Sequence, residues 1–300
     1  MKDRFYKTLM MLSKGTGIWF FRLIAWGIAT GYFMLFPSRV AVSKRFYKAL
    51  FPSKSRIYHL YCAWKQFHQF TDVFLDRFLQ SEEHPMHFTH QGWEYLENAV
   101  TQRTGGILLM SHLGNWELAA HRLLKSHGKD LPEMRLLLYM GRKHKEQIEQ
   151  RQKEDLAAQG IKIVAVEQEG SAPVDILEGI NFLKSGGIVS LTGDRRWREN
   201  QRTVPVKFLG HEALLPESPF VFALLSRTPL LIFFATRVGN FAYHCQVLPP
   251  VYVDAKDRKD RQRAIGDAAQ TYADGLEKVV RQHPFVWFHF EPFIGRKIES

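Results

Sequence analysis

The stretch GGILLMSHLGNWELAAHRLL, residues 105–124, decides how we interpret the fold. It begins with a short apolar run, Gly105–Met110, which is typical of a buried strand. Apolar residues at helical spacing follow this run at once. The polar residues His112 and Glu117 lie where the two patterns meet. The stretch therefore predicts a strand, a turn and a helix in direct succession.

Further apolar runs repeat the strand pattern along the chain, with helical or polar segments between them. These runs are Arg135–Met140, Ile161–Val166, Gly187–Thr192, Leu230–Thr236 and Ala242–Leu248. Buried strands that alternate with helices predict the α/β class, with a central, mostly parallel sheet flanked by helices. In such sheets the reactive groups gather at the carboxyl ends of the strands. We therefore expect functional side chains directly after these runs.

The spacing HxxxxE of His112 and Glu117 suggests a catalytic pair. On one regular helix the two side chains would diverge, but they can converge if His112 lies in the turn before the helix. A histidine near a helix amino terminus stays neutral, and a carboxylate on its other nitrogen fixes its tautomer. We expect His112 to act as a general base and Glu117 to orient it. Asn115, between them, is expected to bind substrate.

A second polar cluster, Asp194-Arg195-Arg196, follows the apolar run Gly187–Thr192. Two guanidinium groups at a strand end suit a phosphate or carboxylate, because they can make paired hydrogen bonds to its oxygens. A solvated charged loop is the alternative interpretation. Arg142 lies in a third basic group, after Arg135–Met140, and could reach the same cleft. We expect these four residues to bind substrate.

The amino end, residues 1–40, is expected to associate with a membrane. Its segment Gly15–Phe36 is about as long as a bilayer span, is rich in aromatic residues and carries only Arg22 as a charge. It could span the membrane or lie at its surface, and a buried amphipathic helix is a further alternative. Basic residues on both sides leave the orientation open. A second amphipathic helix is predicted over Arg56–Leu79.

The composition fits a globular chain with a basic surface. Its 300 residues are 45% hydrophobic, and 41 Lys and Arg against 30 Asp and Glu give a net charge of +11. Such a surface attracts anions, which nucleic acid, acidic membrane lipid or an acidic substrate could supply. The two cysteines, Cys62 and Cys245, form neither a CxxC pair nor a disulfide framework, which fits a reducing compartment. We expect residues 41–300 to form one domain.

Taken in order, these motifs resemble the late acyltransferases of lipid A biosynthesis, the lauroyl and myristoyl transferase family. The resemblance covers most of the chain, and it is more distant to the glycerol-phosphate acyltransferases with an HxxxxD motif. Some blocks look closest to a branch associated with fatty-acid or aryl polyene gene clusters. The blocks that carry the resemblance are SHLGNWE, the strand ending in GDR, RTVPVKFLGHEALLPESPF and the closing PFVWFHFEPF.

The resemblance implies transfer of a fatty acyl chain from an acyl carrier protein or coenzyme A thioester, without a further cofactor, to a hydroxyl of a membrane lipid. It also implies a glycerolipid acyltransferase-like fold, a lipid A acceptor and a place at the cytoplasmic face of the inner membrane, where anionic lipid is a partner. Other glycolipids, phospholipids and an aryl polyene lipid are alternative acceptors. The stretch Leu215–Ser218 departs from the FPEG motif of phospholipid-type enzymes, so glycerol phosphate is less favoured.

Other classes of protein fit the sequence less well. No zinc-finger, helix-turn-helix or RNP pattern supports a nucleic-acid partner, and no GxSxG supports a serine hydrolase. His84, His87 and His90 lie in an expected loop and are interpreted as exposed histidines, so no metal site is expected. A basic membrane-associated binding protein without catalysis is the remaining alternative, because it would need no catalytic pair.

Overall fold

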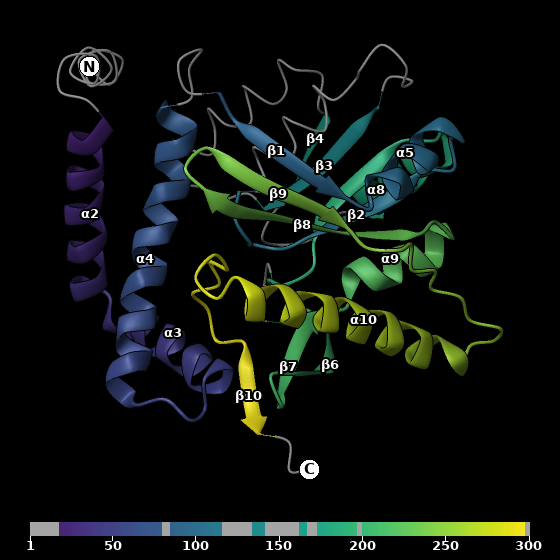
Figure 1. The fold of residues 1–300 in the computed structure, drawn as a ribbon. Coiled ribbons are helices and arrows are strands. Elements are labelled where there is room, and N and C mark those ends of the chain that lie inside the picture. Colours follow the sequence, from purple (N-terminus) through teal and green to yellow (C-terminus); the bar gives the residue numbers. More distant parts are fainter. Residues whose placement is uncertain are drawn as a thin grey trace.

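The computed structural model describes residues 18–79, 85–115, 134–141, 162–166, 173–196 and 200–297 (Figure 1). Its helices are α2 (Ile18–Leu35), α3 (Pro37–Leu50), α4 (Arg56–Leu79), α5 (Trp93–Thr101), α8 (Pro173–Lys184), α9 (Ser218–Ser226) and α10 (Asp260–Gln282). Its strands are β1 (His87–Gln91), β2 (Gly106–Met110), β3 (Leu136–Gly141), β4 (Lys162–Val166), β5 (Ile188–Thr192), β6 (Thr203–Phe208), β7 (His211–Pro216), β8 (Leu230–Gly239), β9 (Ala242–Val247) and β10 (Ile294–Lys297).

The described strands of the main sheet follow the order β1-β9-β8-β2-β5-β3-β4. Strands β8, β2, β5, β3 and β4 pair in parallel, whereas β9 is antiparallel to β8 and parallel to β1. The sheet is thus mixed but mostly parallel, which confirms the α/β prediction. The six predicted apolar runs all form strands of this sheet.

Strand β2 lies inside the sheet and is buried on both faces, which explains why its sequence is apolar throughout. Ile107 and Leu109 join the larger core, which also contains buried side chains of α10 and α9. Leu108 and Met110 join the smaller core, which contains buried side chains of α5. Alternate residues of β2 therefore pack into the two cores on opposite faces of the sheet.

A second, antiparallel sheet in the order β10-β7-β6 lies below the main one in Figure 1. Leu209 and Gly210 join β6 to β7, and both have positive φ, 52° and 73°. Positive φ at both residues is typical of the two-residue turn of a β-hairpin. Helix α9, which follows this hairpin, begins at Ser218, with Glu217 as its N-cap and a proline in its first turn.

Helices α2 and α4 lie side by side at one edge of the structure (Figure 1). The His68 ring of α4 lies against Trp26 and Trp64, with centroid distances of 5.1 and 4.0 Å. Its Nε2 is 3.0 Å from Thr30 Oγ1 of α2. Helix α4 has the bounds that its spacing predicted.

No single helix among the described residues is long and apolar enough to span a bilayer. Trp19–Leu35 and Pro37–Leu50 meet the requirements of length and composition together, as a pair bent by 93°.

A buried ion pair attaches α4 to the main sheet. Arg237 of β8 donates to both carboxylate oxygens of Asp76 in α4, at 2.6 and 3.0 Å. The Tyr243 hydroxyl of β9 donates to the same carboxylate at 3.1 Å. Burial of such charges is tolerated because each one has a partner. The contact fixes α4 beside β8 and β9.

Candidate active site

The polar residues after β2 and β5 come together because these two parallel strands are neighbours that end at the same edge of the sheet. The carbonyl of Met110, the last residue of β2, accepts hydrogen bonds from the Gly193 amide at 2.8 Å and the Tyr272 hydroxyl at 3.1 Å. A Cβ on Gly193 would lie 2.8 Å from the Tyr272 ring, so the close approach requires glycine. His112 and Asp194 follow directly after these anchored ends.

His112 and Asp194 form a closely bonded pair. The His112 Nδ1 and Asp194 Oδ1 atoms are 2.8 Å apart, and the His112 amide donates to Asp194 Oδ2 at 2.8 Å. The carboxylate side chain is fully buried, whereas 23% of the imidazole is exposed. A carboxylate accepts hydrogen bonds only, so Nδ1 carries the proton of this contact. In the neutral ring Nε2 is then unprotonated and can accept a proton.

Asp194 is ionised at neutral pH despite its burial. Burial acts to raise the pKa of its carboxyl group, but the attraction and hydrogen bond of His112, with those of His289 and Trp287, hold this pKa well below its usual range. Trp287 contributes the third N–H group, from Nε1 to Oδ2 at 2.9 Å. A carboxylate that accepts several N–H bonds is stabilised in its charged form.

The segment after α10 holds both halves of this pair through its backbone. The Phe288 amide donates to the His112 carbonyl at 2.8 Å, and the Gly114 amide donates to the Val286 carbonyl at 2.8 Å. Gly114 has a φ of 63°, and a Cβ there would lie 1.9 Å from the Ala235 carbonyl oxygen, so only glycine fits. Arg195 donates to the Phe288 carbonyl at 3.3 Å. The segment thus fixes the loop after β2 and the loop after β5 relative to each other.

His289 is buried behind Asp194. Its Nε2 lies 2.9 Å from the main-chain carbonyl of Asp194, and its Nδ1 lies 3.1 Å from the carbonyl of Glu291. Burial, opposed by the attraction of Asp194, lowers the pKa of His289 to about 4. The ring is therefore neutral at pH 7. Neither Trp287 nor His289 was among the predicted site residues, although both lie in the aromatic block PFVWFHFEPF.

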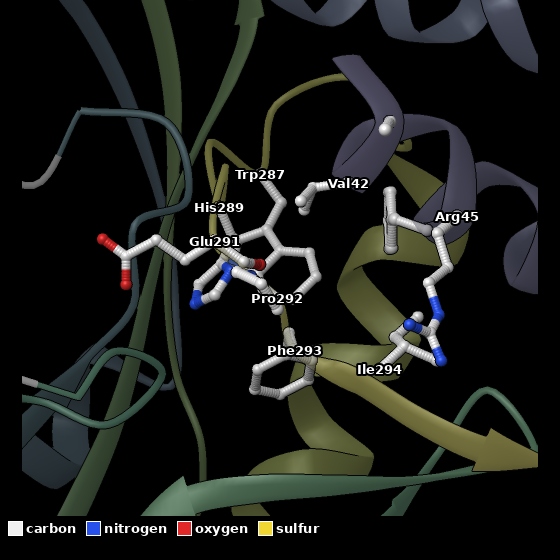
Figure 2. A pocket seen from close by; sticks show the side chains of 10 residues that line it. Val42, Arg45, Trp287, His289, Glu291, Pro292, Phe293 and Ile294 are labelled. Atoms are coloured by element: carbon white, nitrogen blue, oxygen red, sulfur yellow. The ribbon is translucent and has the colours of Figure 1, made fainter. Parts of the chain in front are cut away.

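A cavity of about 190 Å³ lies beside these two residues, between α3 and the C-terminal segment. Figure 2 shows Trp287 and Phe293 between His289 on one side and Arg45 on the other, with the Glu291 carboxylate directed away from Arg45. Most of the lining is apolar. The remaining lining residues are Ala41, Val42, Phe46, Pro292 and Ile294.

The other predicted site residues have different surroundings. The buried Asn115 amide is turned toward α4, where it donates to the Val73 carbonyl at 3.5 Å. Arg195 is partly buried, with its Nε 3.6 Å from Glu291 Oε1, and Arg196 is exposed. Glu117 and Arg142 lie outside the described residues.

Asp194 occupies the position that we expected for a different carboxylate. From the sequence we expect Asp194 to bind substrate and Glu117 to orient the imidazole. The structure instead directs the Asp194 carboxylate to Nδ1 of His112. The two residues are 82 positions apart, and only the order of the strands brings them together.

The described residues contain no group of three His, Cys, Asp or Glu side chains that could hold a metal ion. His87 and His90 lie in β1, so the expectation of a loop there is wrong for these two residues. His84 lies outside the described residues.

The low pKa of His289 predicts a loss of stability in acid. An unfolded histidine titrates near 6.5, so between pH 6.5 and about 4 the unfolded chain binds one proton more than the folded chain. The free energy of unfolding should therefore fall as pH drops through this window, by roughly 3 kcal/mol in total. Urea unfolding at several pH values measures this slope. The variant His289→Gln should have a shallower slope, and an unchanged slope would contradict the assignment.

Comparison with known proteins supports one family. A search of curated proteins gives no match. The family model described as bacterial lipid A biosynthesis acyltransferase matches residues 10–293, which include the pair and the segment that holds it. The chain belongs to the bacterial lipid A biosynthesis acyltransferases and is an acyltransferase.

Proposed function

We propose that this protein transfers a fatty acyl chain from an acyl carrier protein or coenzyme A thioester to a hydroxyl of a lipid A precursor. The proposal rests on the pair of His112 and Asp194, which follow the carboxyl ends of neighbouring strands. The His112 Nδ1 and Asp194 Oδ1 atoms are 2.8 Å apart. Family membership supports acyl transfer in lipid A synthesis. The branch linked to fatty-acid or aryl polyene clusters, and a glycerolipid acyltransferase-like fold, are part of the proposal.

In the proposed reaction the neutral imidazole of His112 takes the proton of the acceptor hydroxyl at Nε2. The hydroxyl oxygen attacks the thioester carbonyl carbon, and a C–O bond forms. The tetrahedral intermediate then breaks its C–S bond, and the departing thiolate takes the proton from the imidazolium. The products are an ester and a free thiol, without a covalent enzyme intermediate. Asp194 stabilises the imidazolium that forms between the two proton transfers.

The remaining predicted residues keep proposed roles. Glu117 is a candidate second acidic group of the HxxxxE motif, and Arg142 is a candidate ligand of an anionic group on the substrate. Arg195 and Arg196 follow Asp194 on the loop after β5, so they can meet a phosphate that approaches His112. Asn115 would serve the site indirectly, through its contact with α4.

Residues 1–40 are proposed to hold the acyltransferase domain, residues 41–300, at the cytoplasmic face of the inner membrane. Helix α2 exposes large apolar side chains, among them Trp19, Ile28 and Leu35. Helix α3, which follows α2 directly, exposes basic side chains, including Lys44 and Lys48. An apolar helix beside a basic one is suited to the surface of an anionic bilayer.

Vesicles that contain anionic lipid should therefore bind the protein, and binding should weaken as salt is added. The double variant Lys44→Glu, Lys48→Glu is expected to bind at least roughly 30-fold more weakly in a sedimentation assay, since each basic residue contributes about 1 kcal/mol. The control variant Lys256→Glu, Lys278→Glu makes the same charge change at other exposed positions. Equal loss in both variants, or no dependence on salt, would contradict a specific basic surface.

Mass spectrometry of membrane lipids tests the proposed acceptor. Cells that carry the gene should contain lipid A with one more acyl chain than cells without it, and purified protein should add that chain to the precursor. Assays that supply either the carrier-protein thioester or the coenzyme A thioester identify which of the two is the acyl donor. An added chain on another glycolipid, a phospholipid or an aryl polyene lipid would replace lipid A as the acceptor. Unchanged acylation of every lipid would contradict the proposed activity.

A further inference from the structure

Asp194 receives two hydrogen bonds from residues that lie nearly a hundred positions further along the chain. Trp287 Nε1 donates to Oδ2 of the carboxylate, and His289 Nε2 lies against the main-chain carbonyl of the same residue. Both side chains are almost completely buried. They hold the carboxylate group and the peptide of Asp194 separately, one at each end of the residue.

The contact with Trp287 completes the set of N–H groups around the carboxylate. Oδ1 lies against His112 Nδ1, while Oδ2 accepts from the His112 amide and from Trp287 Nε1. Without the indole N–H, the buried Oδ2 would retain one donor only. A buried carboxylate that has lost a donor is less stable as an anion and less restricted in its rotation.

The contacts of His289 favour a proton on Nε2. Both nitrogens face carbonyl oxygens, which can only accept hydrogen bonds, yet a neutral imidazole has a single N–H group. The contact of Nε2 with Asp194 is the shorter of the two, 2.9 Å against 3.1 Å. The His289 ring also lies on the Trp287 indole, with ring centroids 5.0 Å apart. The two residues therefore support each other as well as Asp194.

We propose that Trp287 and His289 are positioning residues that hold Asp194 in the orientation that His112 requires, with His289 donating from Nε2. The proposal rests on the proposed function of the His112–Asp194 pair and adds the two residues that act through it. Neither side chain contacts the reacting atoms in this scheme. Their loss should lower kcat and leave KM for either substrate nearly unchanged.

Replacement of Trp287 by phenylalanine removes the indole N–H and keeps an aromatic ring in the core. We expect kcat to fall roughly 10- to 100-fold, as for loss of a hydrogen bond to a charged group. The control is Phe293→Leu, because the Phe293 ring packs on Trp287 and His289, at 5.2 and 5.1 Å, and no described hydrogen bond joins it to Asp194. This control should lower the melting temperature and leave kcat within about twofold.

Variants of His289 test the assigned proton and remain informative if Trp287→Phe is unstable. Glutamine places an amide N–H near the position of Nε2, whereas asparagine places one near Nδ1 and phenylalanine supplies none. We expect His289→Gln to retain kcat within about threefold and the other two variants to lose about tenfold. Equal kcat in all three would overturn the proposed donation from Nε2.

A double-mutant cycle separates this inference from the proposed function. If Trp287 acts through the pair, Trp287→Phe should have no further effect on the residual rate of His112→Ala. Full activity of His112→Ala itself would overturn the proposed function and this inference together. An inactive His112→Ala, with wild-type kcat in Trp287→Phe and His289→Phe, would overturn the positioning role alone. A loss of kcat in Phe293→Leu equal to that in Trp287→Phe would also overturn it.

Discussion

Replacement of His112 by alanine is expected to lower kcat for acyl transfer roughly 10²- to 10⁴-fold, the range typical of a general base. The variant has no group at the position of Nε2 to take the proton of the acceptor hydroxyl, and the proposed reaction has no covalent enzyme intermediate that could replace this step. Binding of donor and acceptor should persist, so KM should change little. Initial rates with purified protein in detergent micelles measure both constants.

The control for this variant is His244→Ala, which removes a histidine of β9 that contacts Thr89 and lies outside the pair. It should retain wild-type kcat. Thermal melting of both variants checks that the loss in His112→Ala is not caused by unfolding. Wild-type activity in a folded His112→Ala would contradict the proposed mechanism.

The variant Asp194→Asn should show a loss of similar size, although it changes one atom. Asparagine can offer its oxygen either to His112 Nδ1 or to the two N–H groups at the Oδ2 position, but not to both. With the amide nitrogen facing Nδ1, the imidazole proton moves to Nε2, where it blocks the base. We therefore expect kcat to fall about 10²- to 10⁴-fold.

The exposed Asp254→Asn is the matched control, with the same chemical change outside the site. Nitrogen-15 NMR of the labelled imidazole offers a second measurement, since it distinguishes a proton on Nδ1 from one on Nε2. The wild-type protein should carry the proton on Nδ1 and Asp194→Asn should not. An unchanged tautomer together with full activity would contradict the role of Asp194.

Six strands of the main sheet could be predicted because they are buried and their sequences are rich in apolar residues, whereas the mostly exposed β1, HFTHQ, has no such pattern. GILLM at β2 and IVSLT at β5 are short runs that the sheet buries almost completely, and their length of five residues favours a strand over a helix. The amphipathic helix α4 was predicted with correct bounds for a similar reason. Its apolar spacing persists over 24 residues.

The carboxylate partner of His112 could not be predicted by local reasoning. Glu117 is close in sequence and suited to the role, so the spacing favours it. Asp194 reaches His112 only because β5 lies next to β2, and strand order is a property of the whole sheet. The expectation that functional groups gather at strand ends did apply to both residues. That expectation did not say which strands are neighbours in the sheet, so it could not pair His112 with Asp194.

Some elements were missed although their signals were present. Helix α10 buries a regular series that includes Ile265, Ala269 and Tyr272, which is the spacing of an amphipathic helix. The hairpin β6–β7 alternates buried and exposed residues around Leu209-Gly210. No local sequence pattern indicated the contacts of Trp287 and His289. These contacts depend on how the C-terminal segment lies across the loops after β2 and β5.

The most direct test of the account is a single-turnover measurement of acyl transfer by four proteins, the wild type, His112→Ala, Asp194→Asn and the double variant. If the imidazole and the carboxylate act as one unit, the double variant should react no more slowly than His112→Ala alone. Losses that multiply in the double variant would mean that the two residues act independently. That result would contradict the pair as the catalytic centre.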